Sequence, residues 1–277
     1  MLRKLFKYDM KFSYRVMLFI YLAAAALSVF LSATILLSQT VEYVSVFSLI
    51  SFLPYMFSLF AVSLSGFLVV AVRVYKNLYS DEGYLTFTLP VTSAQIIWSK
   101  VLLYAFWQIT GIIVLLISIV LPILTIAYSQ GVSGDIVGII ELAADYLAFM
   151  ARTVLNLDAR SITLFFVILF VNFAVMLIST PIVIIFSFSV GQLASRYRLL
   201  ATFGVYYVYN LVMNTILSVI ESAFIAGESL LVPGSSINFD VTSFAQASLM
   251  SLIIDIVVVI LLFLISRHIM TKKLNLI

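Results

Sequence analysis

Six uninterrupted apolar runs constrain this chain more than any other feature of its sequence. A helix needs roughly 20 mainly apolar residues to cross about 30 Å of hydrocarbon. The runs cover approximately residues 16–37, 46–72, 94–128, 162–190, 200–221 and 244–266. Apolar residues are continuous within each run, whereas the strands of a membrane β-barrel alternate. We therefore predict an all-α integral membrane protein with six transmembrane helices, organised as a single domain over residues 1–277.

The composition agrees with this interpretation. Hydrophobic residues make up 64% of the chain and charged residues 10%, whereas soluble domains carry about 25% charged residues. The first run follows five basic residues, as in a signal peptide, but its length of 22 residues exceeds the about 7–15 residues of a cleavable segment. We expect the first run to be an uncleaved membrane span.

The basic residues predict the orientation of the spans. Six spans place both termini on one side, and thirteen of the 15 Lys and Arg residues fall on that side. This inner set is Arg3, Lys4, Lys7, Lys11, Arg15, Arg73, Lys76, Lys100, Arg196, Arg198, Arg267, Lys272 and Lys273, and the outer set is Arg152 and Arg160. The positive-inside rule then predicts a multi-pass protein of the cell membrane with both termini in the cytoplasm. The net charge of +3 follows from this topology and gives no indication of nucleic-acid binding.

Residues 1–15 have the pattern of an amphipathic helix. Leu2, Leu5, Phe6 and Met10 fall near one helical face, and three lysines, Lys4, Lys7 and Lys11, lie mostly off it. We predict an interfacial helix on the cytoplasmic side, with its apolar face in the membrane and its ammonium groups among anionic head groups. The alternative is an ordinary basic flank that sets the topology.

Two predicted outer segments are longer than simple turns. Residues 129–161 contain a stretch of helical spacing and mixed polarity, which predicts an external or interfacial helix. Residues 222–243 are too polar to span, so we expect a short re-entrant or surface helix that ends before Pro233.

A charged and turn-rich segment, residues 73–100, separates the second and third runs on the predicted inner side. Ser80 is typical of a helix N-cap, and Asp81 and Glu82 follow it in the first turn, where carboxylates oppose the positive end of the helix dipole. Pro90 forces the preceding residue towards an extended conformation. The segment predicts a short helix and then an extended step.

The third membrane helix should begin directly after this step. Thr92 and Gln95 have the spacing of a capping box, in which each side chain bonds the other residue's backbone N–H. Lys100 follows two turns later, and we expect its ammonium group to reach back to the interface. Local chemistry alone is equally consistent with a simple connecting loop.

The run GYLTFTLPVTSAQIIWSKVL, residues 83–102, resembles the segment between the second and third spans in permeases of the type-2 exporter class of ATP-binding-cassette transporters. In that class a Leu-Pro step, a small hydroxylated residue, a Gln and a Lys open the third span. The matching residues are Leu89, Pro90, Thr92, Gln95 and Lys100. The basic N-terminus, the six spans and the polar insertion between spans five and six are also similar to that class.

The resemblance implies a coupling helix that docks on a separate ATPase subunit. The residues that it assigns to coupling are Ser80, Asp81, Glu82, Gly83, Tyr84, Leu85, Leu89 and Pro90. It further implies two ATPase subunits, a second permease chain, identical or related, and ATP with Mg on the partner rather than a cofactor in this chain. The few charges in the spans are compatible with lipid-like, amphipathic peptide or drug-like cargo.

Several polar side chains fall inside the apolar runs. Asp255 is the most conspicuous, because a carboxylate at mid-span costs roughly 2.5–3.5 kcal/mol on insertion scales. The others are Gln108, Asn172, Asn210 and Asn214. Asn210 and Asn214 are four residues apart and share a helix face. Each of these residues either bonds a neighbouring helix or lines a substrate path.

A cluster of three tyrosines, Tyr206, Tyr207 and Tyr209, follows two arginines at the start of the fifth span. We interpret this cluster as part of the aromatic belt at the membrane interface.

The sequence carries no motif of an enzyme active site. It lacks the GxxxxGK[ST] loop of an ATPase and the HExxH pair of a zinc protease, it has no Cys, and its one His, His268, flanks the last span. We predict that the chain is not an enzyme. An ion-coupled secondary transporter that uses Asp255, and a non-transporting assembly or sensor subunit, are the alternatives to the permease.

Overall fold

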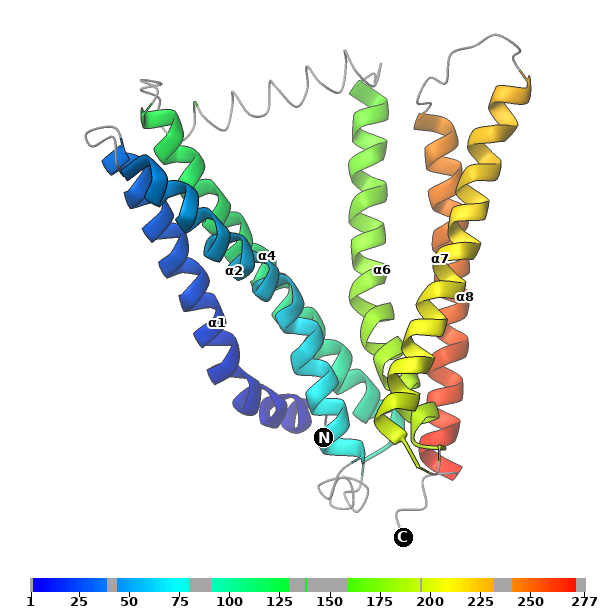
Figure 1. Cartoon of the computed structure of the whole chain (residues 1–277). Coiled ribbons are helices and arrows are strands. Elements are labelled where there is room, and N and C mark those ends of the chain that lie inside the picture. The colour runs from blue at the N-terminus through cyan, green and yellow to red at the C-terminus, as the bar shows by residue number, and fades with distance from the viewer. Residues whose placement is uncertain are drawn as a thin grey trace. The chain divides into compact units, whose positions relative to one another are not determined.

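The computed structural model describes residues 2–38, 44–79, 91–129, 138, 159–194, 196–231 and 241–272. In this part of the chain six long helices follow one another, and a short π-helix, η1, continues α2 (Figure 1). Their bounds are α1 Leu2–Ser38, α2 Val44–Val74, η1 Tyr75–Tyr79, α4 Ser93–Ser129, α6 Ala159–Gly191, α7 Arg198–Leu231 and α8 Val241–Lys272. Each long helix contains a segment long and apolar enough to cross a membrane. Within these residues the prediction of an all-α fold with six helices of membrane-spanning length and hydropathy is confirmed.

The contacts within the predicted membrane domain define two compact units. The first unit comprises Met1–Val70 and Leu102–Tyr146, and the second comprises Ala71–Val101 and Leu147–Ile277. Helices α2 and α4 therefore contribute to both units. The second unit includes the chain on both sides of residues 80–90.

Hydrogen bonds between helices join the first unit. The Thr34 and Ser51 hydroxyl groups lie 3.1 Å apart and connect α1 to α2. The Tyr21 hydroxyl donates to the Trp107 carbonyl at 2.9 Å and connects α1 to α4. A side chain at Gly111 would meet that hydroxyl, since a Cβ atom there would lie 3.3 Å from it. Small residues let helices approach closely in membranes, where hydrocarbon provides no hydrophobic driving force between them.

A tyrosine completes the hydrogen bonding of α4 where a proline interrupts it. Pro122 has no N–H and cannot bond the carbonyl of Ser118, four residues earlier. The Tyr55 hydroxyl, from α2, donates to that carbonyl at 3.0 Å, and Tyr55 is buried. An unsatisfied backbone group in hydrocarbon costs several kcal/mol. This contact therefore stabilises α4 by satisfying the Ser118 carbonyl, and it also holds α2 against α4.

The N-terminal residues form the first turns of α1, and Figure 1 shows these turns bent away from the axis of the rest of the helix. The face predicted to enter the membrane packs in part on α4 instead. The rings of Phe6 and Phe106 are in edge contact at 6.4 Å, and the Trp107 indole N–H donates to the Ser13 hydroxyl at 2.9 Å. Asp9 lies on the same face and is buried. The three lysines of this segment are exposed, as the pattern predicted.

The second unit is built from α6, α7 and α8, which pack against one another. The end of α6 approaches α7 very closely, because a Cβ atom at Gly191 would lie 2.7 Å from both the N and the Cα atoms of Thr202. Only glycine fits here without moving the backbone of α7.

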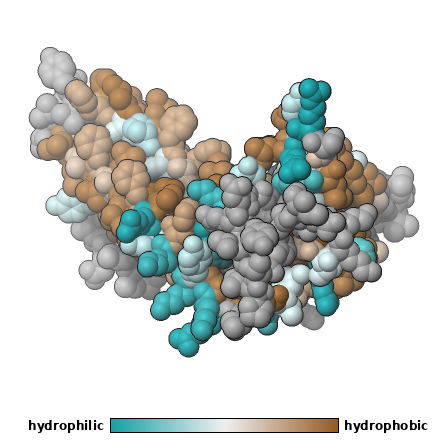
Figure 2. All heavy atoms as spheres, turned by 90° about the horizontal axis from the view of Figure 1, so that it is seen from below, coloured by the Kyte–Doolittle hydropathy of each residue, from teal (hydrophilic) through white to brown (hydrophobic). Residues whose placement is uncertain are grey.

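Figure 2 looks onto the end of the molecule at which α7 begins and α8 ends, where hydrophilic side chains gather while hydrophobic ones cover the helix flanks.

Two aromatic contacts tie the chain around residues 80–90 into this unit. The ring of Tyr75, in η1, lies 6.1 Å from that of Phe188 in α6. The ring of Trp98, in the second turn of α4, lies 6.3 Å from that of Phe263 in α8. Motion of the chain on either side of residues 80–90 would therefore act directly on α6 and α8.

The start of α4 agrees with the predicted capping box. The Thr92 N–H donates to Gln95 Oε1 at 3.2 Å, and the Gln95 N–H donates to Thr92 Oγ1 at 3.4 Å. The expectation for Lys100 was wrong, because its side chain is 2% exposed and is enclosed by protein rather than extended to the interface.

Helix α7 is longer than the sequence suggested. It continues without interruption to Leu231, so the first part of residues 222–243 is the end of a membrane helix and not a separate short helix. The charged residue in this stretch of α7, Glu228, does not stop the helix because glutamate is a good helix former. Most of residues 129–161, including the predicted external helix, lies outside the described residues.

Replacing Tyr55 with Phe removes the donor that the Ser118 carbonyl needs. We expect Tyr55→Phe to lower the free energy of unfolding by about 1–2 kcal/mol, the usual cost of an unsatisfied buried acceptor. Unfolding in mixed micelles measures this difference. Tyr128→Phe is the matched control, because Tyr128 is exposed on α4 and its variant should unfold like the parent chain. Equal stability of both variants would contradict the role given to Tyr55.

Candidate functional site

A stripe of six residues runs along one face of α7. Each member lies three or four residues from at least one other member, the spacing that places side chains on the same side of a helix. The stripe covers eleven residue steps, about 16 Å of helix at 1.5 Å per residue. Its members are Tyr206, Tyr209, Asn210, Met213, Asn214 and Leu217.

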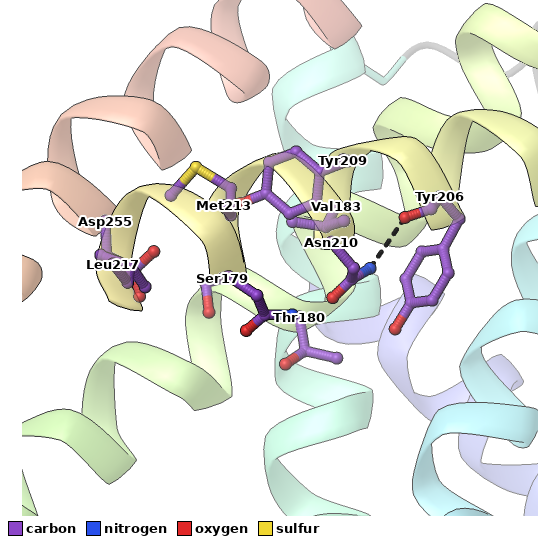
Figure 3. A pocket seen from close by; sticks show the side chains of 10 residues that line it. Ser179, Thr180, Val183, Tyr206, Tyr209, Asn210, Met213, Leu217 and Asp255 are labelled. Atoms are coloured by element: carbon purple, nitrogen blue, oxygen red, sulfur yellow. Dashed lines mark hydrogen bonds between the residues drawn. The ribbon is translucent and has the colours of Figure 1, made fainter. Parts of the chain in front are cut away.

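This stripe forms one wall of a pocket of about 180 Å³ in the second unit. Ser179, Thr180 and Val183 of α6 form a second wall, and Asp255 of α8 completes the lining. Figure 3 shows these side chains, with Tyr206 and Asp255 at opposite ends of the group. Seven of the ten lining residues carry a polar side-chain group, although all ten lie in helices apolar enough to span a membrane.

A proline weakens the backbone of α6 beside the pocket. Pro181 follows Thr180 and has no N–H to donate to the carbonyl of Leu177. Discontinuities of this kind in membrane helices are tolerated where the backbone is buried in protein or lines a cavity. Pro181 is fully buried, so the altered backbone faces protein rather than lipid.

One polar side chain of the stripe forms a hydrogen bond within α7 itself. The Asn210 side-chain amide donates to the backbone carbonyl of Tyr206 at 2.8 Å (Figure 3). This contact leaves the carbonyl oxygen of the Asn210 side chain as an acceptor. The contact fixes the direction in which that acceptor points.

Asp255 is the one ionisable carboxyl group of the pocket. It is half-buried, and within the described part of the chain its carboxylate has no hydrogen-bond or ion-pair partner. Tyr209 lies within electrostatic range of this group. An intramembrane carboxylate is costly and usually faces a bundle interior or a wet cavity, and the position of Asp255 at this pocket agrees with that rule.

The side chains of the pocket can bind a ligand through hydrogen bonds and charge. They carry hydroxyl groups, amides, phenol groups and one carboxylate. Among the residues that the structure describes, no three His, Cys, Asp or Glu side chains form a group that could hold a metal ion.

The structure brings together three of the five intramembrane polar residues singled out in the sequence. Asn210, Asn214 and Asp255 all line the pocket. Asn172 lies on α6 but bonds the carbonyl of Ile168 at 2.9 Å and is absent from the lining. Gln108 lies in the first unit, where its side-chain oxygen would lie 2.9 Å from a Cβ atom at Gly66.

The residues predicted for coupling lie outside the described part of the chain. They are Ser80, Asp81, Glu82, Gly83, Tyr84, Leu85, Leu89 and Pro90. Their assignment stays a prediction.

Two pocket residues were misinterpreted in the sequence. Tyr206 and Tyr209 were expected in an interfacial belt with Tyr207, but they face the pocket, whereas Tyr207 is 68% exposed. The spacing of 206, 209 and 210 could have shown this, because it continues the face shared by Asn210 and Asn214.

Buried charges near the helix ends were also missed. Asp9 and Arg73 are each 1% exposed, although the sequence placed them in interfacial segments. For Asp9 a signal existed, because it falls on the apolar face of its amphipathic helix. For Arg73 no local pattern distinguishes a buried residue from an interfacial one.

Comparison with known proteins gives no relative. No family model matches the chain, and neither the curated proteins nor the solved structures contain a significant match.

The pocket carboxylate should reduce the stability of α8 in the membrane. We expect Asp255→Leu to favour insertion of α8 by roughly 3 kcal/mol on biological insertion scales. A glycosylation-based insertion assay of the isolated α8 segment measures this difference. Met250→Leu, an exposed apolar position on the same helix, is the control and should leave insertion unchanged. Equal insertion of the Asp255→Leu segment and the parent segment would show that Asp255 carries no such cost.

Proposed function

We propose that this chain is the membrane-spanning permease subunit of an ATP-driven exporter of the ATP-binding-cassette class. Two such chains, identical or related, pair in the membrane, and two ATPase subunits bind on the cytoplasmic side. ATP and Mg bind to the ATPase subunits. The cargo is lipid-like, an amphipathic peptide or a drug-like molecule.

The residues of the exporter-like run support this proposal through their local structure. In the type-2 permeases that the run resembles, the third span opens directly after a Leu-Pro step. Here α4 begins at Ser93, three residues after Pro90, and the reciprocal bonds of Thr92 and Gln95 fix that start. The π-helix Tyr75–Tyr79 comes just before Ser80, and such irregular turns occur frequently at functional sites.

The observation that carries the proposal is the composition of the second unit. The chain that leads into residues 80–90, and the chain that leaves them, belong to the same compact unit as the polar pocket. Tyr75 contacts α6 and Trp98 contacts α8, the two helices that face α7 across the pocket. A force applied at residues 80–90 would therefore reach the pocket through packed side chains.

This connection suggests a mechanism. Closure of the ATPase pair would push the coupling segment and shift the ends of α2 and α4 that belong to the second unit. Helices α6 and α8 would follow and change the access to the pocket between them and α7. Transporters use rigid-body movements of this kind to expose one site alternately to the two sides of a membrane.

An ion-coupled secondary transporter is the second candidate. The observation that favours it is the carboxylate of Asp255, which has no hydrogen-bond or ion-pair partner among the described residues and could bind a coupling ion. In this case an ion gradient would drive transport of the cargo by the purified chain alone, and Asp255→Asn would abolish that transport.

Charge reversal in the coupling segment tests the exporter. We expect the double variant Asp81→Lys, Glu82→Lys to weaken binding of the ATPase at least about tenfold, because charged contacts at an interface become repulsive. ATP-driven transport should fall in parallel, while the six helices remain inserted. Co-purification of the ATPase from native membranes and transport in reconstituted vesicles are the two measurements.

The matched control reverses two charges on the predicted outer side, Glu141→Lys with Asp145→Lys, and should bind the ATPase normally. Normal transport by the variant with Asp81→Lys and Glu82→Lys would contradict the coupling role, and residues 80–90 would then only connect two helices. Full transport by the purified chain alone, with no ATPase recovered from native membranes, would refute the exporter.

A further inference from the structure

The charge of the α6–α7–α8 pocket is its most selective property. Asp255 supplies one negative charge, and none of the ten lining residues is Lys, Arg or His. An anionic ligand would meet an uncompensated like charge at low dielectric, whereas a cation would neutralise the carboxylate. The pocket therefore discriminates between ligands by the sign of their charge.

The walls around the carboxylate suit an organic cation. Tyr209, which interacts electrostatically with Asp255, contributes an aromatic ring, and ring faces attract ammonium groups through their quadrupole. Met213, Val183 and Leu217 contribute apolar surface for the rest of a ligand. The side-chain oxygens of Asn214 and Ser179 are acceptors for the N–H groups of a primary amine.

The size of the pocket argues against a bare metal ion. Its volume of about 180 Å³ exceeds that of a cavity of about 150 Å³ known to hold benzene. A Ca²⁺ site gathers about six to eight oxygen ligands around one point, whereas the lining residues of this pocket are spread over about 16 Å of α7 and include one carboxylate. A ligand with a small ammonium head and an attached ring or chain fills the space and matches the stripe of about 16 Å along α7.

We infer that the end of the pocket at Asp255 and Tyr209 binds the monovalent ammonium head group of an amphipathic molecule, whose apolar part extends towards Tyr206. Its identification as the cargo site rests on the proposed export function. Binding itself requires only this chain.

A pair of probes that differ in charge alone tests the inference. Benzyltrimethylammonium carries a quaternary nitrogen, and neopentylbenzene has a carbon atom in the same place. Binding of each radiolabelled probe to the purified full chain in lipid nanodiscs is measured after subtraction of the binding to empty nanodiscs. The wild-type chain should bind the cation saturably, at least about tenfold more tightly than its neutral isostere.

Two substitutions locate the site. Asp255→Asn keeps the shape of the side chain and removes its charge, and should weaken binding of the cation at least about tenfold with no effect on the neutral probe. Tyr209→Leu should weaken it about fivefold by removing a ring. Tyr207→Leu is the matched control, since Tyr207 is exposed and outside the pocket, and should bind as the wild type does. Circular dichroism confirms that each variant is folded.

Three results would overturn the inference. They are equal affinity for the two probes, unchanged affinity in a folded Asp255→Asn variant, and complete displacement of the cation by millimolar sodium, which would identify an inorganic-ion site. The export function is tested separately, with the ATPase recovered from native membranes. Cation binding without ATP-driven transport would refute the exporter but not the site, and ATP-driven transport without cation binding would refute the site alone.

Discussion

Backbone amides have no water to bond inside a membrane, and this constraint determines most of the structure of the chain. It makes helices the only way for the six apolar runs to cross. It also explains why Pro122, near the C-terminal end of α4, is accompanied by a tyrosine from α2: the Tyr55 hydroxyl satisfies the Ser118 carbonyl that Pro122 leaves without a donor. Many serine and threonine hydroxyls meet the same constraint by bonding the carbonyls of their own helices, as Ser187 does with Val183.

The features that are costly in a membrane are concentrated around the candidate site. The second unit contains a proline in α6, a row of polar side chains on α7 and a carboxylate on α8, all around one pocket. Polar groups that are costly in hydrocarbon gather there, while most of the other residues of these helices are apolar. The segments that flank residues 80–90 belong to this unit as well. The site and the chain on both sides of the proposed point of force application thus belong to one unit.

Sequence reasoning predicted the features that local chemistry controls. Apolar length gave the six helices, and the spacing of Thr92 and Gln95 gave the cap that begins α4. The shared face of Asn210 and Asn214 was also correct. The errors came from packing between helices, which local patterns do not encode: Lys100 has an aliphatic stem suited to either snorkelling or burial, and only its neighbours decide. The ATPase-coupling role of residues 80–90 depends on a partner surface that this chain does not contain, so it stays a prediction.

The proposed exporter requires that ATP hydrolysis on a partner subunit changes access to the pocket. Because the chain has no Cys, a single cysteine at Met213, which is buried at the pocket wall, can report that access. The measurement is the rate at which membrane-impermeant thiol reagents label Met213→Cys from each side of vesicles that contain the ATPase complex. If the chain is an ATP-driven exporter, trapping the ATPase in its closed state should move labelling of Met213→Cys from the inner to the outer side. Labelling that is the same with and without ATP, in vesicles whose ATPase is bound and active, would contradict it.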